Sequence, residues 1–208
     1  MPEPGSSHPR SVEYRWAREK QILISQILEY DDENQLVTNR VASAWKSEFV
    51  YDGANRRRIQ RDYGWQSGTW VQTNEVRLVY DGGVVLQHRD GNNLPTITLT
   101  RGLDLSGSLQ GAGGIGGLLA MTESFGPHSY YHADGSGNVT ALVNVNQLLV
   151  GKYSYDSFGS TLSINGPKAL INPYRFSSKP IHDLTGRYDF LRRWYTKPSE
   201  TSAAEPAS

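Results

Sequence analysis

The sequence contains no cysteine, and its charges cancel, with 21 Lys and Arg residues against 21 Asp and Glu residues. The lack of cysteine excludes a disulfide framework, a thiol nucleophile and a thiolate metal site. A formal net charge of zero removes the long-range attraction on which nucleic-acid and anionic-membrane binders depend. We therefore expect neither nucleic acid nor a membrane surface as a partner.

Long hydrophobic runs are also missing. The longest uncharged window, Leu105 to Thr122, contains six glycines and only eight apolar side chains, too few to bury its backbone in lipid. The N-terminal residues are polar, and the first apolar stretch, Ile22 to Leu28, is interrupted by Ser25 and Gln26. We expect no membrane span and no signal peptide in this chain.

The chain is instead rich in turn-forming and aromatic residues, with 21 Gly, 10 Pro and 11% aromatic side chains. Short apolar runs with a period of two residues, each followed by Gly, Asn or Asp, predict strands joined by tight turns. These runs are residues 21–30, 75–80, 84–88, 96–100 and 139–144. The best helix candidate, Val12 to Leu28, mixes β-branched and aromatic residues with its charges and lacks caps. We predict an all-β fold between disordered tails at residues 1–11 and 197–208.

The dipeptide Tyr-Asp recurs at irregular spacings and opens the same turn pattern. The copies are Tyr30-Asp31, Tyr51-Asp52-Gly53, Tyr80-Asp81-Gly82, Tyr155-Asp156 with Gly159, and a looser copy formed by Tyr131, Asp134, Gly137 and Asn138. In each unit we expect the ring to pack on the neighbouring repeat, the carboxylate to accept main-chain N–H bonds, and the Gly or Asn to take a positive φ. Such a unit cannot bury its face alone, so it needs stacked neighbours.

Four ordered blocks in the C-terminal half resemble the YD-repeat or rearrangement-hot-spot (RHS) proteins of bacteria, whose repeats also occur in teneurin-like shells. The blocks are residues 128–143, residues 153–159, Asn172-Pro173-Tyr174-Arg175-Phe176 with the three residues that follow, and residues 183–186. Residues 101–105 and 113–120 are similar to the segment that precedes this core in the family. The resemblance implies a β-sheet ribbon that spirals into a hollow shell around a variable C-terminal segment, often a toxin.

The same resemblance divides the chain into YD-repeat β-hairpins at residues 12–127 and an RHS-associated core-like segment at residues 128–196. The chain departs from the family pattern near its end, where Thr196-Lys197-Pro198 stands in place of an Asp-Pro pair. We therefore expect the plug and the self-cleavage segment of some relatives to be missing, as in a C-terminally truncated or degenerate piece. About six repeat units are too few to wrap a cage. The expected fold is antiparallel hairpin repeats in a curved, spiralling sheet that is open rather than closed.

The function that the resemblance implies is a non-enzymatic scaffold that, in full-length relatives, encloses or presents a secreted C-terminal polypeptide or toxin. The implied partners are the remainder of a longer RHS polypeptide or that cargo, and the implied location is secreted or at the cell surface. The alternative is a cell-surface adhesion or carbohydrate-binding module that binds glycans. Its ligand surface would consist of Arg56, Arg57, Arg58, Trp65 and Trp70, since rings stack on ligand faces and cations bind anionic groups. An exposed strand after a Tyr-Asp turn explains the same residues.

Other patterns that could carry chemistry lack their required context. The segment Gly111-Ala-Gly-Gly-Ile-Gly116 matches G-x-G-x-x-G, but a poor, short helix candidate follows it and no alternating βα pattern surrounds it. His128 and His132 would lie on one face of a strand about 13 Å apart, and zinc needs three or four ligands. The remaining carboxylates that stand out, Asp104, Asp183 and Asp189, are predicted to be turn residues. We predict no catalytic residue, no cofactor and no metal.

An open sheet also leaves unpaired edge strands. Few gatekeeping charges interrupt the apolar runs at residues 84–86, 96–100 and 139–143. Zero net charge removes the repulsion that would keep molecules apart. We expect the isolated chain to self-associate, most strongly near neutral pH.

Overall fold

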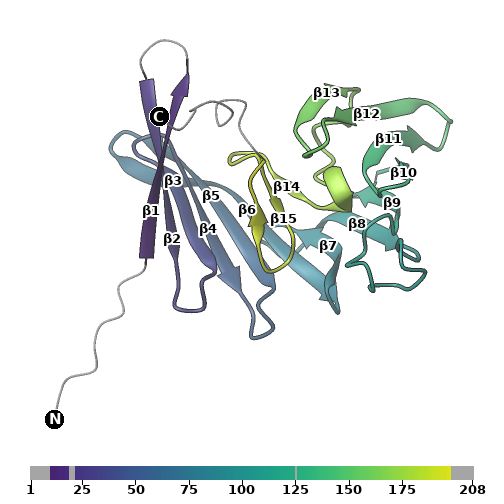
Figure 1. Ribbon diagram of the computed structural model, residues 1–208, viewed down its shortest axis with the longest axis horizontal. Coiled ribbons are helices and arrows are strands. Elements are labelled where there is room, and N and C mark those ends of the chain that lie inside the picture. Colours follow the sequence, from purple (N-terminus) through teal and green to yellow (C-terminus); the bar gives the residue numbers. More distant parts are fainter. Residues whose placement is uncertain (1–9, 19–21, 125, 198–208) are drawn as a thin grey trace, which may run out of the picture. The chain divides into compact units, whose positions relative to one another are not determined.

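The structure is a computed structural model that describes residues 10–18, 22–124 and 126–197, and nearly all regular structure in it is β (Figure 1). The strands are β1 Arg10–Arg18, β2 Ile22–Tyr30, β3 Leu36–Val41, β4 Trp45–Tyr51, β5 Arg57–Gln66, β6 Thr69–Asp81, β7 Val84–Arg89, β8 Pro95–Arg101, β9 Leu118–Glu123, β10 His128–Ala133, β11 Val139–Asn144, β12 Leu149–Tyr155, β13 Thr161–Asn165, β14 Ile181–His182, β15 Arg187–Asp189 and β16 Trp194–Tyr195. Within the described residues, one 3-10 turn, η1, covers Phe176–Ser178. The predicted all-β class is confirmed.

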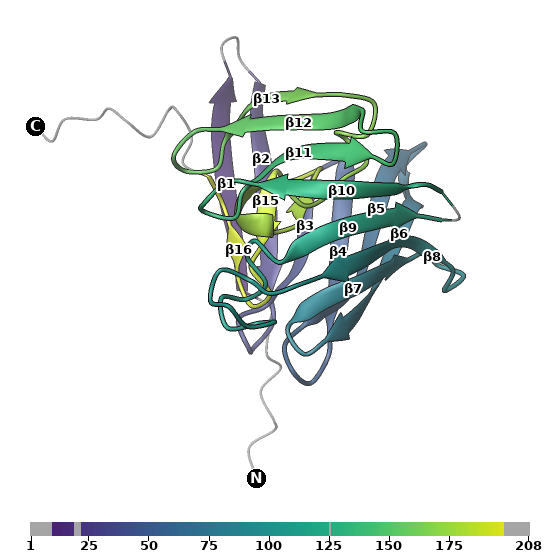
Figure 2. The ribbon, with the colours of Figure 1, turned by 90° about the vertical axis from the view of Figure 1, so that its right-hand side faces the viewer.

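The strands are paired in chain order. A meander runs from β1 to β13, with each strand hydrogen-bonded to its neighbours in sequence, and β14, β15 and β16 form a second small sheet. The pairs whose registers are resolved are antiparallel, and Figure 2 shows β9 to β13 lying side by side. Because the order is linear, the meander is open over the described residues, as expected. The absence of helix signals at residues 12–28 agrees with the structure, since residues 12–18 belong to β1 and residues 22–28 to β2, and the two strands pair from Arg10 with Tyr30 to Arg18 with Ile22.

The chain divides into two compact units. Unit 1 comprises the described residues up to Val79 together with Arg89–Leu94, and unit 2 comprises Tyr80–His88 and the described residues from Pro95 onward. The motif boundary at residues 127 and 128 falls within unit 2 and stays a prediction. The predicted tails fall outside the described residues except for residues 10, 11 and 197, and residues 10 and 11 belong to β1.

Unit 2 is held by an apolar and aromatic core. Strand β10 shows the underlying pattern, because Ser129 and Tyr131 are buried whereas His128, Tyr130 and His132 alternate with them on the exposed face. The most deeply buried large side chains of the unit are Met121, Val139, Leu142, Tyr174 and Tyr188. Burial of one face of each strand fixes which residues pair.

Unit 1 has a row of polar side chains across its strands in place of a purely apolar centre. Strand register aligns Asn39 on β3 with Ser47 on β4, Ser47 with Asp62 on β5, and Asp62 with Asn74 on β6. The Ser47 hydroxyl donates to the Asp62 carboxylate at 2.7 Å, and the Asn74 amide donates to the same carboxylate at 3.1 Å. Ser47 and Asp62 are buried, so these bonds offset part of the cost of removing their polar atoms from water. Asn39 is also buried, and over the described residues its side-chain amide has no hydrogen-bond partner.

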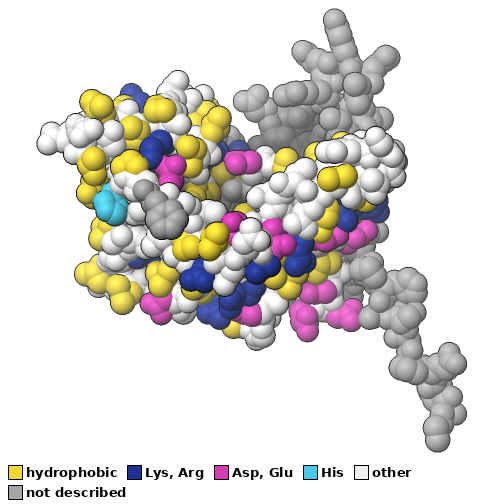
Figure 3. Space-filling view, turned by 180° about the vertical axis from the view of Figure 1, so that it is seen from behind, with side chains coloured by type: hydrophobic (Ala, Val, Ile, Leu, Met, Phe, Trp, Pro, Cys, Tyr) yellow, Lys and Arg dark blue, Asp and Glu magenta, His cyan; other side chains and the backbone are white. Residues whose placement is uncertain are grey.

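Charged side chains of opposite sign are interleaved on the surface of the molecule (Figure 3). In unit 1, Glu75 accepts from Arg61 at 2.8 Å and from Arg77 at 2.7 Å, and Glu48 accepts from Lys46 at 2.6 Å. Opposite charges in this unit are therefore paired at short range. Over the described residues, no helix has the length and apolar character that a membrane crossing requires. Self-association stays a prediction, and Leu162 on β13, the last strand of the meander, is 68% exposed.

The core of unit 2 can be tested with a matched pair of leucine substitutions. Leu142 on β11 has no exposed surface, whereas Leu162 on β13 is 68% exposed. We expect Leu142→Ala to lower the free energy of unfolding by about 2–5 kcal/mol, since it removes buried methyl groups and leaves a cavity. Leu162→Ala should change it by less than about 0.5 kcal/mol. Urea unfolding of both variants measures this, and equal losses would contradict the burial described here.

Candidate functional site

One five-residue turn recurs throughout the chain. In each copy the N–H of the first residue donates to the carbonyl of the fifth, and the N–H of the fourth donates back to the carbonyl of the first. With an Asp or Asn in the first position, the turn opens at Asp31, Asp52, Asp90, Asp104, Asp134, Asn144 and Asp156. The fourth residue of these copies has a positive φ, and it is Asn34, Asn55, Asn93, Gly107, Gly137, Gln147 or Gly159. The same two bonds occur in the turn that opens at Arg175, where the fourth residue is Ser178.

The side chain of the first residue completes this turn. Asp156 shows the geometry, since its Oδ1 accepts the N–H groups of Phe158 and Ser160, both at 2.8 Å. Partial burial raises the pKa of Asp156, but these N–H donors outweigh it, so that the pKa lies below its ordinary value. Asn144 makes the same bonds to Asn146 and Leu148 without a charge. The recurrent carboxylates therefore have a structural role in closing hairpins.

A β-bulge precedes these turns and orients the tyrosine. The register shifts directly before Tyr30, Tyr51 and Tyr155, and the residue before the turn pairs with the residue just after it. At the bulge the Tyr51 hydroxyl donates to the Leu36 carbonyl at 3.0 Å, and the Tyr155 hydroxyl donates to the Val139 carbonyl at 2.8 Å. Tyr51 and Tyr155 each join the last residue of one strand to the first residue of the strand before it.

The predicted copy at Tyr80-Asp81-Gly82 has a different structure. Only Gly82 and Gly83 separate β6 from β7, and Gly82 has a φ of 53°. The Gly83 N–H donates to the Gln110 side chain at 2.7 Å, and the Gln110 amide donates to the Asp81 carbonyl at 3.1 Å. Tyr80-Asp81 thus has the same sequence as the other Tyr-Asp copies but precedes a two-residue turn, which the side chain of Gln110 supports.

The looser predicted copy has the same turn at Asp134 to Asn138, but its tyrosine differs, because Tyr131 belongs to a buried network centred on Asn172. The Asn172 carbonyl oxygen accepts the Tyr131 hydroxyl at 2.8 Å and the Tyr174 N–H at 3.0 Å. Its amide donates to the Tyr153 hydroxyl at 3.2 Å and to the Tyr174 carbonyl at 2.6 Å. Complete burial raises the pKa of Tyr131 well above its ordinary value. Asn172 thus joins three sequence blocks that the family resemblance singled out.

The rest of the Asn-Pro-Tyr-Arg-Phe segment follows the same pattern. The Arg175 carbonyl accepts the Val139 N–H at 3.0 Å, and the Ser177 N–H donates to the Asn138 side chain at 2.8 Å. The Tyr174 hydroxyl lies 2.9 Å from Nε2 of His88 in the interior. These bonds anchor η1 beside the turn that opens at Asp134.

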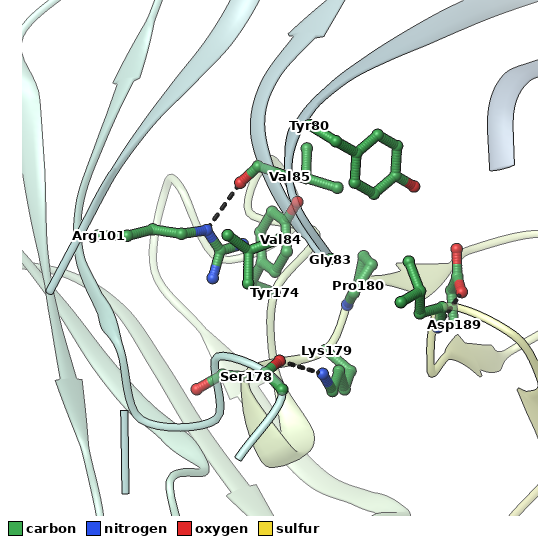
Figure 4. Close-up of a pocket in the computed structure, with 12 residues that line it drawn as sticks. Tyr80, Gly83, Val84, Val85, Arg101, Tyr174, Ser178, Lys179, Pro180 and Asp189 are labelled. Carbon is green, nitrogen blue, oxygen red and sulfur yellow. Dashed lines mark hydrogen bonds between the residues drawn. The ribbon is translucent and has the colours of Figure 1, made fainter. Parts of the chain in front are cut away.

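A small cavity lies next to this network in unit 2 (Figure 4). Its volume is about 30 Å³, and Arg101, Tyr174 and Lys179 are among the residues that line it. The Arg101 Nε donates to the Val85 carbonyl at 2.7 Å, and the Lys179 ammonium donates to the Gly113 carbonyl at 2.6 Å. Burial, and then the charge of Arg101, lowers the pKa of Lys179. A cavity of this volume has room for one or two water molecules, which is too little for an organic cofactor.

The glycine-rich segment at residues 111–116 binds a carboxylate of its own chain. The Asp104 Oδ2 accepts the N–H groups of Ala112 at 2.7 Å and Gly114 at 3.0 Å. Ser106 donates to Oδ1 through its hydroxyl at 2.6 Å and its N–H at 2.9 Å. The Ser106 hydroxyl is the main cause that lowers the pKa of Asp104 to about 2, against the effect of burial and with help from the loop amides. Because Asp104 occupies these amides and no helix follows, the loop does not form a pyrophosphate-binding turn.

The predicted ligand surface does not assemble as one patch. Arg56 and Arg58 pair with Asp52 at 2.8 and 3.7 Å, and Arg57 is buried with its guanidinium carbon 5.7 Å from the Phe49 ring centroid. Trp65 lies eight residues along β5, roughly 26 Å from Arg57 at the usual strand rise. The extended strand therefore separates the arginines from the tryptophans.

The tryptophans instead form an aromatic cluster at the other end of β5. Trp65 pairs directly with Trp70 across the β5–β6 hairpin, with ring centroids 4.8 Å apart and an angle of 69° between the planes. The Lys46 ammonium lies 4.3 Å from the Tyr63 ring centroid and 5.7 Å from that of Trp70. Trp65 is 37% exposed. We call Lys46, Tyr63, Trp65 and Trp70 the aromatic cluster.

The other predicted chemical residues have separate local partners. His128 and His132 are exposed, and Nδ1 of His128 lies 2.7 Å from the Thr122 hydroxyl. Within the described part of the chain, no three His, Cys, Asp or Glu side chains gather as a metal site would need. Asp189 is buried and accepts the Leu191 N–H at 2.7 Å, while Asp183 lies 3.5 Å from Arg175.

Comparison with known proteins places this chain beside segments of much longer ones. No family model matches it. It is 27% identical over 123 residues to the tRNA3(Ser)-specific nuclease WapA of Bacillus spizizenii, a match that covers 59% of this chain and 5% of the nuclease. It superimposes on the crystal structure of TcdB2-TccC3 with a TM-score of 0.54 at 15% identity, covering 82% of this chain and 8% of that one. For the Photorhabdus luminescens Tc holotoxin pore the TM-score is 0.57 at 16% identity, covering 84% and 8%. These matches confirm the resemblance to RHS and YD-repeat proteins over a fragment of their length.

The Asp104 carboxylate can be tested through pH. Its pKa of about 2 in the folded state lies below the ordinary value of 3.8, so its contribution to stability is complete above about pH 4 and is lost as the pH falls through 2. We expect Asp104→Asn to lower the free energy of unfolding at pH 7. The difference in free energy of unfolding between this variant and the unsubstituted chain, the stability gap, should narrow between pH 4 and pH 2. Urea unfolding across this range measures the gap. Asp81→Asn, at an exposed side chain, is the control, and a gap independent of pH would contradict the role of the charge.

Proposed function

We propose that this chain is a non-enzymatic wall segment of an RHS or YD-repeat shell. In the full-length protein, such a segment encloses or presents a secreted C-terminal polypeptide. The observation that carries the proposal is the recurrent turn, in which an Asp or Asn side chain closes a hairpin within an open meander. The structural match over 82% of the chain to a segment of TcdB2-TccC3 supports it.

The chemistry of the conspicuous polar residues favours a structural role. The carboxylates of Asp52, Asp134 and Asp156 accept main-chain N–H bonds within their own turns. A general acid or base needs instead a carboxylate that faces a substrate. The buried Asn172 network binds neighbouring segments of the same chain. We propose that the chain supplies no catalytic residue, and that its partners are the rest of a longer RHS polypeptide and its cargo, secreted or at the cell surface.

Co-expression tests this function. The tagged chain is produced together with the polypeptide encoded directly downstream of it, and an unrelated polypeptide of equal length is the control. We expect the downstream polypeptide to co-purify and to resist added protease, because a wall segment shields what it contacts. A downstream polypeptide that stays unbound, or that is digested as fast as the control, would contradict the proposal.

The aromatic cluster supports glycan binding as a second candidate. Trp65 and Trp70 offer edge-to-face rings on an exposed hairpin, and Lys46 places a cation beside them. Sugar rings stack on such faces through their C–H groups, an interaction that salt screens little. The buried Arg57 and the paired Arg56 and Arg58 play no part in this version of the surface.

A glycan array with two variants separates this candidate from the shell. If the chain is such a module, we expect glycan binding to be insensitive to salt and to fall about 5- to 150-fold in Trp65→Ala, since loss of one stacked ring is worth about 1–3 kcal/mol. Tyr130→Ala, at a tyrosine of unit 2 that is 43% exposed, should leave it unchanged. No binding to any glycan, or equal loss in both variants, would exclude the module.

A further inference from the structure

Arg175 is a buried cation whose hydrogen bonding is incomplete. Its exposed fraction is 5%, and its guanidinium carbon lies 6.0 Å from the Tyr153 ring centroid. Over the described residues, Nε and Nη2 have no hydrogen-bond partner. The main chain holds this residue in place, because its N–H donates to the Lys179 carbonyl at 3.0 Å and its carbonyl accepts from Val139 at 3.0 Å.

The two nitrogens without partners belong to the same edge of the guanidinium plane. The N–H bonds of Nε and Nη2 point in parallel along this edge, and a carboxylate can accept both with its two oxygens. A buried guanidinium that lacks such an acceptor is costly, since desolvation is not offset. The geometry therefore selects a planar anion with two oxygens in preference to a neutral or cationic group.

The carboxylate of Asp183 lies within ion-pair distance of Arg175 but makes no hydrogen bond to it. Oδ1 of Asp183 lies 3.5 Å from Nη2 of Arg175, beyond ordinary hydrogen-bond length, and its side chain is 69% exposed. Asp183 follows β14, where the N–H groups of Thr185 and Gly186 both donate to the His182 carbonyl. The main-chain bonds of this turn therefore do not depend on Asp183, which leaves its carboxylate available for Arg175.

A second cation adds to the positive charge of this region. The Lys197 ammonium lies 5.8 Å from the Tyr188 ring centroid, and burial together with the charge of Arg175 lowers its pKa. Asp156 opposes this effect on Lys197, but its Oδ1 is engaged by the amides of its own turn. Because two cations influence each other here, the surroundings of Arg175 favour the binding of one further negatively charged group.

We propose that the Nε–Nη2 edge of Arg175 is a carboxylate-binding site. The carboxylate comes from Asp183, which closes on Arg175 by a small movement of its exposed side chain, or from an acidic group of another polypeptide that displaces Asp183. Either source makes two parallel charge-assisted bonds to the same edge. This site does not depend on the proposed shell function, because it is a property of unit 2 alone.

Acetate tests the site in the full chain, since it is the smallest carboxylate probe with the same two oxygens. Thermal unfolding at pH 7 is compared in sodium acetate and in sodium chloride at equal ionic strength, for the unsubstituted chain, Asp183→Ala and the control Asp81→Ala. Acetate at ten times its dissociation constant should lower the unfolding equilibrium constant about 11-fold in a chain whose site is free. We expect no stabilisation by acetate in the double variant Asp183→Ala with Arg175→Lys, because lysine retains the positive charge but not the planar edge.

The pattern across variants identifies the source. Stabilisation by acetate that appears only in Asp183→Ala assigns the site to Asp183 of the same chain. Equal stabilisation in all three chains shows that the site is open and assigns it to a foreign acidic group. No acetate effect in any chain, or an effect that persists with Arg175→Lys, overturns the proposal. If the lysine variant does not fold, the Nε–H resonance of Arg175 in Asp183→Ala replaces it, and this signal must move on addition of acetate.

Discussion

The hydrogen bonds between an Asp or Asn side chain and the main chain of its own turn are the interaction on which the meander depends. A strand that slips by one residue exchanges its buried face for its exposed face. The closing pair occupies the same position in several hairpins, directly on either side of the turn, with a bulge just before it. Examples are Tyr51 with Arg57 and Tyr155 with Thr161. The turn therefore fixes the register of both strands at their ends, and the alternation of buried and exposed residues then follows along each of them.

Polar side chains also hold unit 2 together beyond its hairpins. The segment that follows β13 has little regular structure, so its main-chain groups need partners from elsewhere. Asn172 supplies two of them by bonding both the N–H and the carbonyl of Tyr174, while it accepts from Tyr131. Because each partner is buried, loss of one leaves others without hydrogen bonds, which makes this network more cooperative than separate surface contacts.

Much of this organisation could be predicted from the sequence, but only where local chemistry determines it. Turns with Asp followed by Asn or Gly at the fourth position were recognisable, because such residues tolerate a positive φ. The turn closed by Gln147 carries no such signal, and Tyr80-Asp81-Gly82 carries a misleading one. The role of Asp104 depends on donors eight and ten residues further on. The arginines and the tryptophans of the predicted ligand surface lie at opposite ends of an extended strand, a separation that composition does not show.

The order of pairing explains how most of this fold can form through local contacts. Each strand of the meander bonds to the next strand in sequence, and the recurrent turns close within five residues, so the loop-closure entropy is small for the hairpins that these turns connect. Contacts of this kind form without help from distant segments. The exceptions lie in unit 2, where Asn172 and Tyr174 bond to Tyr131 and His88, 41 and 86 residues away. The hairpins therefore supply local order, and the core-like segment supplies the long-range contacts that join them into one unit.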